Sequence, residues 1–287
     1  MALARVRDLL SSLYEKYSVD GVLTLAEMSK YNRLTAIEKR IAEIMGEVYS
    51  RGGKLVNRLT KDVYQAAFYR HEWAVAQGVG ADISFGLLNP KAIEAVVGNP
   101  MAKIALEGMK DNGLRKIKRE ITQGLIRGDS YPKMASAIKG AFDTDARDTL
   151  RIVRTEGQRA MNQGIKEAYE EAEAQGVDII QVWDASLDTR TRPDHAALDG
   201  VEGRKGGGYD VAWHFPSGGW SPSPGNSGIA KQDINCRCRL VGKIRGYEPK
   251  SRRIRDEGVQ PYKTFADWAQ EKGITRNQYG QTYSTGG

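Results

Sequence analysis

Apolar side chains recur every three or four residues up to residue 176 of this chain, and from Val177 onward they alternate instead. The first spacing is typical of helices with one buried face and the second of strands. The strand candidates are VDIIQVWDAS, starting at Val177, and CRCRLVGKI, starting at Cys236. The sequence therefore predicts an α+β fold. We expect a mainly helical N-terminal region with a long helical hairpin, followed by a small α+β unit with a short antiparallel sheet and a long internal loop.

Glycine and proline divide the helical region. Two long periodic segments flank Gly52-Gly53, so we expect an antiparallel hairpin that turns there. Further helices are predicted after Asn89 and Asn99, up to Gly128, and after Asp129 or Ser130. A last helix is expected to open at Asp143 or Thr144 and to close at Gly176.

Three domains follow from this division. Residues 1–80 are expected to form a helical hairpin arm. Residues 81–243 are expected to form one domain, with helices at 90–175 and the small sheet unit at 177–243. About fifty residues between its strands are rich in Gly, Pro and Ser, and GRKGGGY among them indicates a flexible loop. Residues 244–287 are expected to be a basic linker, a short helix (KTFADWAQEKG) and a flexible tail.

Composition narrows the class of protein. Hydrophobic residues make up 40% and charged residues 28%, as in globular rather than disordered chains. No stretch reaches the roughly 20 consecutive apolar residues that a membrane span needs. The chain has two cysteines, which do not make a disulfide framework, so synthesis in a reducing compartment is expected.

The two cysteines, Cys236 and Cys238, lie one residue apart in the second strand candidate. Alternate residues of a strand project from one face, so we expect both thiols on the same side. Two thiols on one face chelate zinc when other ligands approach, and one Zn²⁺ could hold the long loop in place. His195 is the third candidate ligand. The fourth stays open among Asp194, Asp199, His214 and Asp233.

Two other interpretations of these residues stay open. The cysteines can be small packed residues, with His195 hydrogen-bonded to a nearby acid. An enzyme, nuclease-like or effector-like, is the other alternative. Its nucleophile, base and orienting acid would come from Asp188, Asp194, His195, Asp199 and Cys236. The sequence contains no G-x-S-x-G, no H-E-x-x-H and no phosphate-binding glycine loop, which argues against catalysis.

The segment DTRTRPDHAALDG alternates acids and bases. Arg190 and Arg192 flank Asp188 and Asp194, which indicates a local ion-pair network that folds the turn, with a DNA or partner contact as the alternative. Trp183 is expected in the core of the small unit.

The net charge is +7, and two stretches are markedly basic: LRKIKREITQGLIRG (114–128) and RLVGKIRGYEPKSRRIR (239–255). They indicate either a solvated positive face or a contact with nucleic acid. Base-stacking aromatic residues do not interleave with these bases, so the expected contact is with phosphates. The candidate DNA-binding residues are Lys116, Lys118, Arg119, Arg245, Lys250, Arg252, Arg253 and Arg255.

Three successive blocks of sequence resemble the Mu-F-like phage head-morphogenesis family, also called minor head or minor capsid proteins. The blocks are RTEGQRAMNQGIKEAYEEAEAQGV, VWDASLDTRTRPDHAALDG and PSPGNSGIAKQDINCRCRL, within about residues 110–243. The motif residues are Arg154, Glu156, Trp183, Asp188, Arg190, Arg192, Asp199, Gly200 and Asn235. Many relatives look as if they have Cys-x-x-Cys where this chain has Arg192 and His195, and a histidine where it has Asp233. The resemblance thus implies metal binding in those relatives, and this chain keeps His195, Cys236 and Cys238.

The resemblance implies a non-enzymatic component of a tailed-phage head, made in the bacterial cytoplasm and carried inside the virion near the portal. The implied partners are the portal protein, phage DNA bound without sequence preference and other head proteins, with no membrane contact during assembly. We expect residues 1–80 to dock on the portal and the protein to assist head assembly and DNA packaging or ejection. A packaged enzyme has little room after residue 243. A scaffold held to DNA by charge alone leaves the motif-rich loop unexplained.

Overall fold

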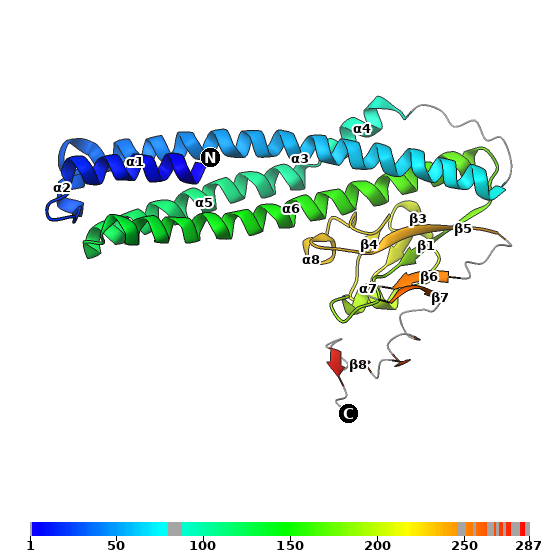
Figure 1. Cartoon of the computed structure of the whole chain (residues 1–287). Helices are drawn as coiled ribbons and strands as arrows, with labels where there is room; N and C mark the ends of the chain where they lie inside the picture. Colours follow the sequence, from blue (N-terminus) through cyan, green and yellow to red (C-terminus); the bar gives the residue numbers. More distant parts are fainter. Residues whose placement is uncertain are drawn as a thin grey trace. The chain divides into compact units, whose positions relative to one another are not determined.

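The computed structural model describes residues 2–79, 88–245, 251–254, 257–262, 267, 270–271, 274–276 and 282–284 (Figure 1). The helices are α1 Ala2–Tyr17, α2 Leu25–Ser29, the 3-10 turn η1 Lys30–Asn32, α3 Arg33–Val79, α4 Pro90–Val97, α5 Pro100–Arg127, α6 Tyr131–Ala174, α7 Pro193–Ala197 and α8 Ala230–Asp233. The strands are β1 Ile179–Asp184, β2 Arg204–Gly206, β3 Tyr209–His214, β4 Trp220–Ser221, β5 Arg239–Ile244, β6 Ser251–Ile254, β7 Gly258–Pro261, β8 Ile274–Arg276 and β9 Thr282–Ser284. The predicted α+β class is confirmed.

The chain forms two compact units. The first comprises Met1–Arg58 and Gly98–Val153. Apolar faces of α1, α3, α5 and α6 meet in its core, where Val6, Ile41, Ile117, Ile121 and Met134 are almost completely buried. Each such side chain contributes about 1.5–3 kcal/mol through burial. This unit is therefore a helical bundle built on the predicted periodicity.

The second unit comprises Leu59–Val97 and Arg154–Gly287. It contains the C-terminal parts of α3 and α6, the sheets and the two cysteines. Its largest core cluster joins apolar residues of α3 and α6 to residues of β1, β3 and β5, including Ile165, Trp183, Trp213 and Leu240. Trp183 lies in this core, fully shielded from solvent.

The predicted turn at Gly52-Gly53 is wrong, because α3 continues through both glycines as one helix (Figure 1). A glycine inside a helix costs about 1 kcal/mol relative to alanine. Beyond the glycines α3 buries Val56 and Tyr64 on its inner face. Burial of these side chains offsets the cost of the glycines, so the helix is not interrupted.

The predicted helix start at Asp143 or Thr144 is also wrong, because α6 is continuous from Tyr131 to Ala174. Asp143 pairs with Lys139 one turn earlier, at 2.9 Å. The Thr144 hydroxyl donates to the Gly140 carbonyl at 3.1 Å instead of capping a new helix. These side chains can cap a helix, but here they are satisfied inside one.

The end of the helix at Gly128 is confirmed. Gly128 has a φ of +68°, and Asp129 follows it into the tight turn between α5 and α6. Asp129 is buried and pairs with Arg127 at 2.7 Å and Lys133 at 2.6 Å, while its carbonyl accepts the Tyr14 hydroxyl at 2.6 Å. These contacts fasten the turn to the first helix of the same unit.

Strands β1 and β5 pair antiparallel, with Trp183 opposite Leu240. The predicted antiparallel sheet is therefore present. Residues 200–203 run beside β1: the amides of Gly200 and Gly203 donate to the carbonyls of Trp183 and Gln181, both at 2.8 Å. The segment that contains the motif Asp199-Gly200 is thereby fixed to the central strand.

The long internal loop is not irregular, contrary to expectation. It contains α7, the sheet β2-β3-β4 and α8. GRKGGGY forms a hairpin in which Gly207 and Gly208 take φ values of +60° and +87°. The Trp220 ring packs on Gly206 and Gly207, where any added Cβ would lie within 2.4 Å of it. Glycine is required here for close packing rather than for flexibility.

Beyond residue 250, β6 pairs with β7 and β8 with β9. Most of the predicted helix KTFADWAQEKG lies outside the described residues, as do Lys250 and Arg255.

Candidate metal centre

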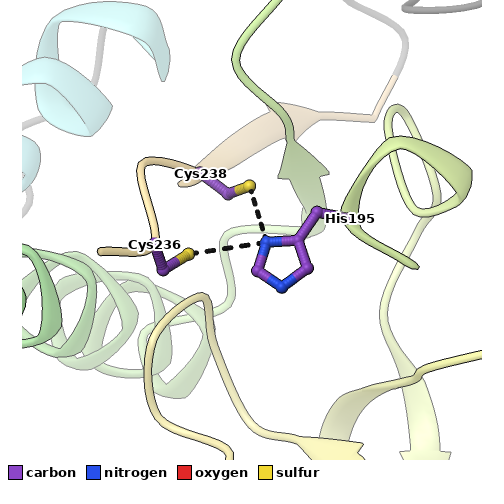
Figure 2. Close-up of side chains that lie close together, drawn as sticks. All are labelled: His195, Cys236 and Cys238. Carbon is purple, nitrogen blue, oxygen red and sulfur yellow. Dashed lines mark hydrogen bonds between the residues drawn. The ribbon is translucent and has the colours of Figure 1, made fainter. Parts of the chain in front are cut away.

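Figure 2 shows His195 facing Cys236 and Cys238. His195 lies on α7, which has Pro193 at its first turn. Proline suits this position, because its ring fixes φ near the helical value and the missing N–H would have no partner there. This local geometry turns His195 inward, where it is buried.

The two cysteines lie between α8 and β5, since β5 begins at Arg239. The expectation that they lie on the strand is wrong. The chain turns at Asn235, which has a φ of +56°, and the Cys236 amide donates to the Asp233 carbonyl at 3.0 Å. A turn, rather than strand alternation, brings both thiols to one side.

Three potential zinc ligands lie close together in this cluster. His195 Nδ1 lies 3.3 Å from Cys238 Sγ and 3.7 Å from Cys236 Sγ. All three ligand atoms lie within 4.8 Å of one another. Zinc bonds of about 2.3 Å to sulfur and about 2.05 Å to nitrogen place those atoms about 3.6 Å apart at the tetrahedral angle. The two nitrogen–sulfur distances are therefore close to those of a tetrahedral zinc site.

Aromatic rings shield the cluster. The His195 ring stacks on Phe215 with ring centres 5.6 Å apart and meets the edge of Trp183 at 5.4 Å. Both cysteines are buried, at 3% and 2% exposure. An apolar shell of this kind limits the access of water to a metal and to the thiols.

The two thiols differ in acidity. A hydrogen bond from Cys238 is the main cause that lowers the pKa of Cys236, to about 5, against the effect of burial. Burial raises the pKa of Cys238 above its ordinary value. Cys236 is thus the thiol that most readily supplies a thiolate, the form that binds metal.

The candidate fourth ligands face other partners. Asp194 accepts from Ser217, Asp199 from the Ala185 amide, and Asp233 from Ser227 and Gly228, while His214 packs against Trp220. Over the described part of the chain, three donors meet at this site. A zinc ion would take its fourth ligand from water or from another molecule.

Two side chains of α6, which the sequence analysis missed, hold the cysteine segment. Asn162 is fully buried and donates to the Cys238 carbonyl at 3.0 Å, while its own oxygen accepts the Leu240 amide at 2.9 Å. Gln158 donates to the same Cys238 carbonyl at 2.6 Å. Gln158 and Asn162 lie four residues apart, so the sequence places them on the same face of a helix. That spacing alone did not identify them, because polar residues are common on helices and usually contact solvent.

The charged motif residues contact the cysteine segment and each other. Asp188 accepts hydrogen bonds from Arg237 and lies 3.6 Å from Arg190. Arg192 donates to the carbonyls of Gln232 and Ile234. These contacts fasten the turn before α7 to the segment that contains the cysteines.

The other motif residues lie nearby. Glu156 pairs with Arg159 at 2.9 Å, whereas Arg154 is exposed on α6. The Asn235 amide donates to the Thr155 hydroxyl at 3.1 Å. Asp199 caps the end of β1 through the Ala185 amide at 2.8 Å, and Gly200 has a φ of +76°. The contacts of Glu156, Asn235 and Asp199 thus help to build the fold.

Three of the basic candidates are paired with acids. Lys118 lies 3.0 Å from Glu38, Arg119 lies 3.3 Å from Glu120 and Arg245 lies 2.5 Å from Asp178. Lys116 is half-buried on α5. Arg252 and Arg253 lie on β6. Paired lysines and arginines attract phosphates less strongly than free ones, because their charge is partly neutralised.

Comparison with known proteins shows the family. Residues 115–241 match the family described as Phage Mu protein F like protein. The minor head protein GP7 of Bacillus phage SPP1 is 30% identical over 278 residues, which cover 94% of this chain and 89% of that protein. The chain belongs to the Mu-F-like phage head-morphogenesis family. The matched segment of this Mu-F-like chain contains His195, Cys236 and Cys238.

Two more distant relatives differ in length. The NAD(+)–arginine ADP-ribosyltransferase EFV of Enterococcus faecalis is 26% identical over 89% of this chain, which spans 52% of that protein. An uncharacterized protein of Haemophilus influenzae is 27% identical over a segment that covers 55% of this chain and 32% of the Haemophilus protein. No solved structure matches the Mu-F-like chain. Among the described helices, none is long and apolar enough to cross a bilayer.

Proposed function

We propose that this chain is a non-enzymatic minor head protein that assembles at the portal vertex, inside the head of a tailed phage. The observation that carries the proposal is the 30% identity with a phage minor head protein across 94% of the chain. Similarity over nearly the whole length of both proteins supports a shared role in head morphogenesis. Other head proteins are then the expected neighbours.

Helix α3 supports a docking role for the N-terminal residues. Leu55 and Trp73 are each 67% exposed on this helix, although large apolar side chains normally lose solvent on folding. Exposed tryptophan is a residue type that often dominates binding energy in protein interfaces. We assign portal docking to exposed apolar side chains of this kind within residues 1–80.

Co-expression with the portal protein of the same phage tests this proposal. The chain is expected to co-purify with the assembled portal through size-exclusion chromatography. Removing residues 1–80 would be uninformative, because α1 and α3 supply much of the first unit's core. A folded, full-length chain that elutes apart from the portal would contradict the docking role.

We also propose that the two basic stretches, 114–128 and 239–255, contact the phosphates of phage DNA. Phosphate contacts of this type would assist packaging or ejection without reading sequence. Retention on DNA should then fall steeply as salt rises, since binding releases counterions. Retention that does not change with salt would argue against phosphate contacts.

Zinc at His195, Cys236 and Cys238 is the proposed cofactor, in a structural role. The ion would join α7 to the cysteine segment and add the binding energy of a metal to folding. Plasma mass spectrometry should find near-stoichiometric zinc in the wild type and none in Cys236→Ser/Cys238→Ser. An apo wild type, purified without chelator, would leave packing alone to order this region.

The relative named as an ADP-ribosyltransferase does not lead us to propose an activity. The chain spans only 52% of that protein, so its printed activity need not belong to the shared part. In this chain, Asp188, Asp194 and Asp199 are engaged in structural hydrogen bonds and do not point at the cysteines. The arrangement supports structure rather than catalysis.

A further inference from the structure

Gln232 on α8 connects the candidate metal centre to a carboxylate. Its side-chain oxygen lies 3.0 Å from His195 Nε2, the ring nitrogen that points away from the two sulfurs. Its side-chain nitrogen donates to Asp194 and lies 3.3 Å from the Ser217 hydroxyl. Gln232 is buried, at 3% exposure. A buried amide with both ends occupied has a fixed orientation.

The hydrogen-bond chemistry determines that orientation. The Asp194 carboxylate has only acceptor atoms, and it also accepts the backbone N–H and the hydroxyl of Ser217. The Gln232 group that faces Asp194 must therefore be the NH₂. The Gln232 oxygen then faces His195, and an oxygen needs a donor opposite it. His195 must carry a proton on Nε2.

We propose that Gln232 is a positioning residue of the metal centre. Held by Asp194 and Ser217, it keeps the His195 proton on Nε2 and so makes Nδ1 the atom that binds metal. Nδ1 is the nitrogen that lies 3.3 Å and 3.7 Å from the two sulfurs. This inference rests on the proposed zinc site, and it adds a residue that belongs to neither the ligand set nor the motif residues.

A neutral amide between histidine and carboxylate has a specific advantage. Metal-bound histidines usually donate their second N–H to a carboxylate, carbonyl or water, which fixes the tautomer and the ring orientation. Gln232 provides a carbonyl-type acceptor without placing a negative charge against the buried ring. It also links α7, through His195, to α8, so the same bond orders two very short helices.

Nuclear magnetic resonance reads the tautomer directly in metal-free, reduced protein. Two-bond ¹H–¹⁵N correlations of the imidazole separate a ring protonated on Nε2 from one protonated on Nδ1. The chain has three histidines, so a His195→Gln variant assigns the signal. We expect His195 protonated on Nε2 in the wild type and a mixture of tautomers in Gln232→Met. A wild type protonated only on Nδ1 would overturn the proposal.

Zinc affinity, measured by competition with a chelator, gives the second readout. Gln232→Met should weaken zinc binding by about 10–100-fold, the usual effect of losing such a partner. Gln175→Met is the matched control, because Gln175 is exposed just after the end of α6 and its side chain donates to Glu171, at 3.2 Å, away from the candidate metal centre. It should bind zinc as the wild type does.

A double substitution distinguishes positioning from simple packing. Asp194→Asn/Gln232→Glu moves the NH₂ donor from position 232 to position 194. A carboxylate oxygen at position 232 then still accepts from His195 Nε2, and the NH₂ at position 194 donates to the other carboxylate oxygen. It should restore most of the zinc affinity that Gln232→Met loses. Zinc binding that Gln232→Met leaves unchanged overturns this proposal alone. A wild type that binds no zinc overturns the metal centre and this proposal together.

Discussion

Arg237 and Asp188 form a two-armed ion pair across 49 residues of sequence, with Nη2 and Oδ1 2.7 Å apart. Arg237 lies between the two cysteines in the sequence, and Asp188 lies in the turn before α7. The pair therefore connects the segment that leads into the helix of His195 to the segment that contains the two cysteines.

The acidity of Asp188 allows this pair to be tested. Burial alone would raise the pKa of Asp188, but the hydrogen bonds and charge of Arg237 outweigh it and lower the pKa from 3.8 to about 2. A carboxyl whose pKa is lower in the folded than in the unfolded chain stabilises the fold when the pH is above the unfolded pKa. That stability is lost as pH falls from about 4 to about 2.

Asp188→Asn should accordingly lower the free energy of unfolding at pH 7 by about 1.5–3 kcal/mol, as expected for a hydrogen bond to a charged group. It should also flatten the pH dependence below pH 4. Asp210→Asn is the control, since its pair with Lys205 is exposed and should leave the melting temperature unchanged. Equal effects of the two variants in thermal unfolding would contradict this role.

Gly164 permits α3 and α6 to pack closely within the second unit. A Cβ at Gly164 would lie 2.4 Å from the Tyr64 carbonyl oxygen and 3.1 Å from the Ala67 Cβ. Gly164→Ala should lower stability by about 1–3 kcal/mol through overpacking. Gly157→Ala on the same helix meets nothing within 4 Å and should raise stability by about 0.5–1 kcal/mol. Chemical denaturation followed by circular dichroism measures both, and opposite signs are required.

Glu72 is a buried acid on α3 whose Oε1 has no hydrogen-bond partner among the described residues. Burial first, and the charge of Glu171 second, raise its pKa from 4.5 to about 7. A raised carboxyl pKa penalises the folded state once the group ionises, so stability falls as pH rises from about 4.5 to about 7. Glu72→Gln should raise the melting temperature at pH 8 and leave it unchanged at pH 4. The same gain at both pH values would show that charge is not the cause.

If α3 docks on the portal, substitutions of its exposed apolar residues should weaken portal binding, whereas a substitution of an exposed apolar residue on another helix should not. Leu55→Ser and Trp73→Ser should each weaken the complex with the portal by about 10-fold or more, the scale of an interface hot spot. Ile126→Ser is the control, because Ile126 is also exposed but lies on α5 outside residues 1–80. Affinity measured with immobilised portal compares the three. A loss confined to Ile126→Ser would place the interface elsewhere.

Local pattern predicted several elements and some of their ends, but not the continuity of the long helices. Strands β1 and β5 and the turn at Gly128 follow from β-branched alternation and from glycine chemistry. The continuity of α3 through Gly52-Gly53 could not be predicted, because it depends on burial of residues such as Tyr64 against parts of the chain distant in sequence. The glycines at 206 and 207 indicated flexibility, while the structure uses them to receive Trp220.

The same limit applies to the site. Residue type identified His195, Cys236 and Cys238, since thiols and imidazole are recognisable metal ligands. Gln232 and Asn162 were missed because amides carry no such signature, and their roles depend on which groups surround them once the chain is folded. Asp194 was a candidate metal ligand. In the structure it contacts Gln232, which lies between Asp194 and His195.

Quantitative mass spectrometry of purified, DNA-filled phage particles tests the central claim most directly. If the chain is a minor head protein held inside the head, it will be present in a few copies per particle. It will also resist added protease until the particles are opened. Absence from the particles, in cells that produce the folded protein, would contradict the account.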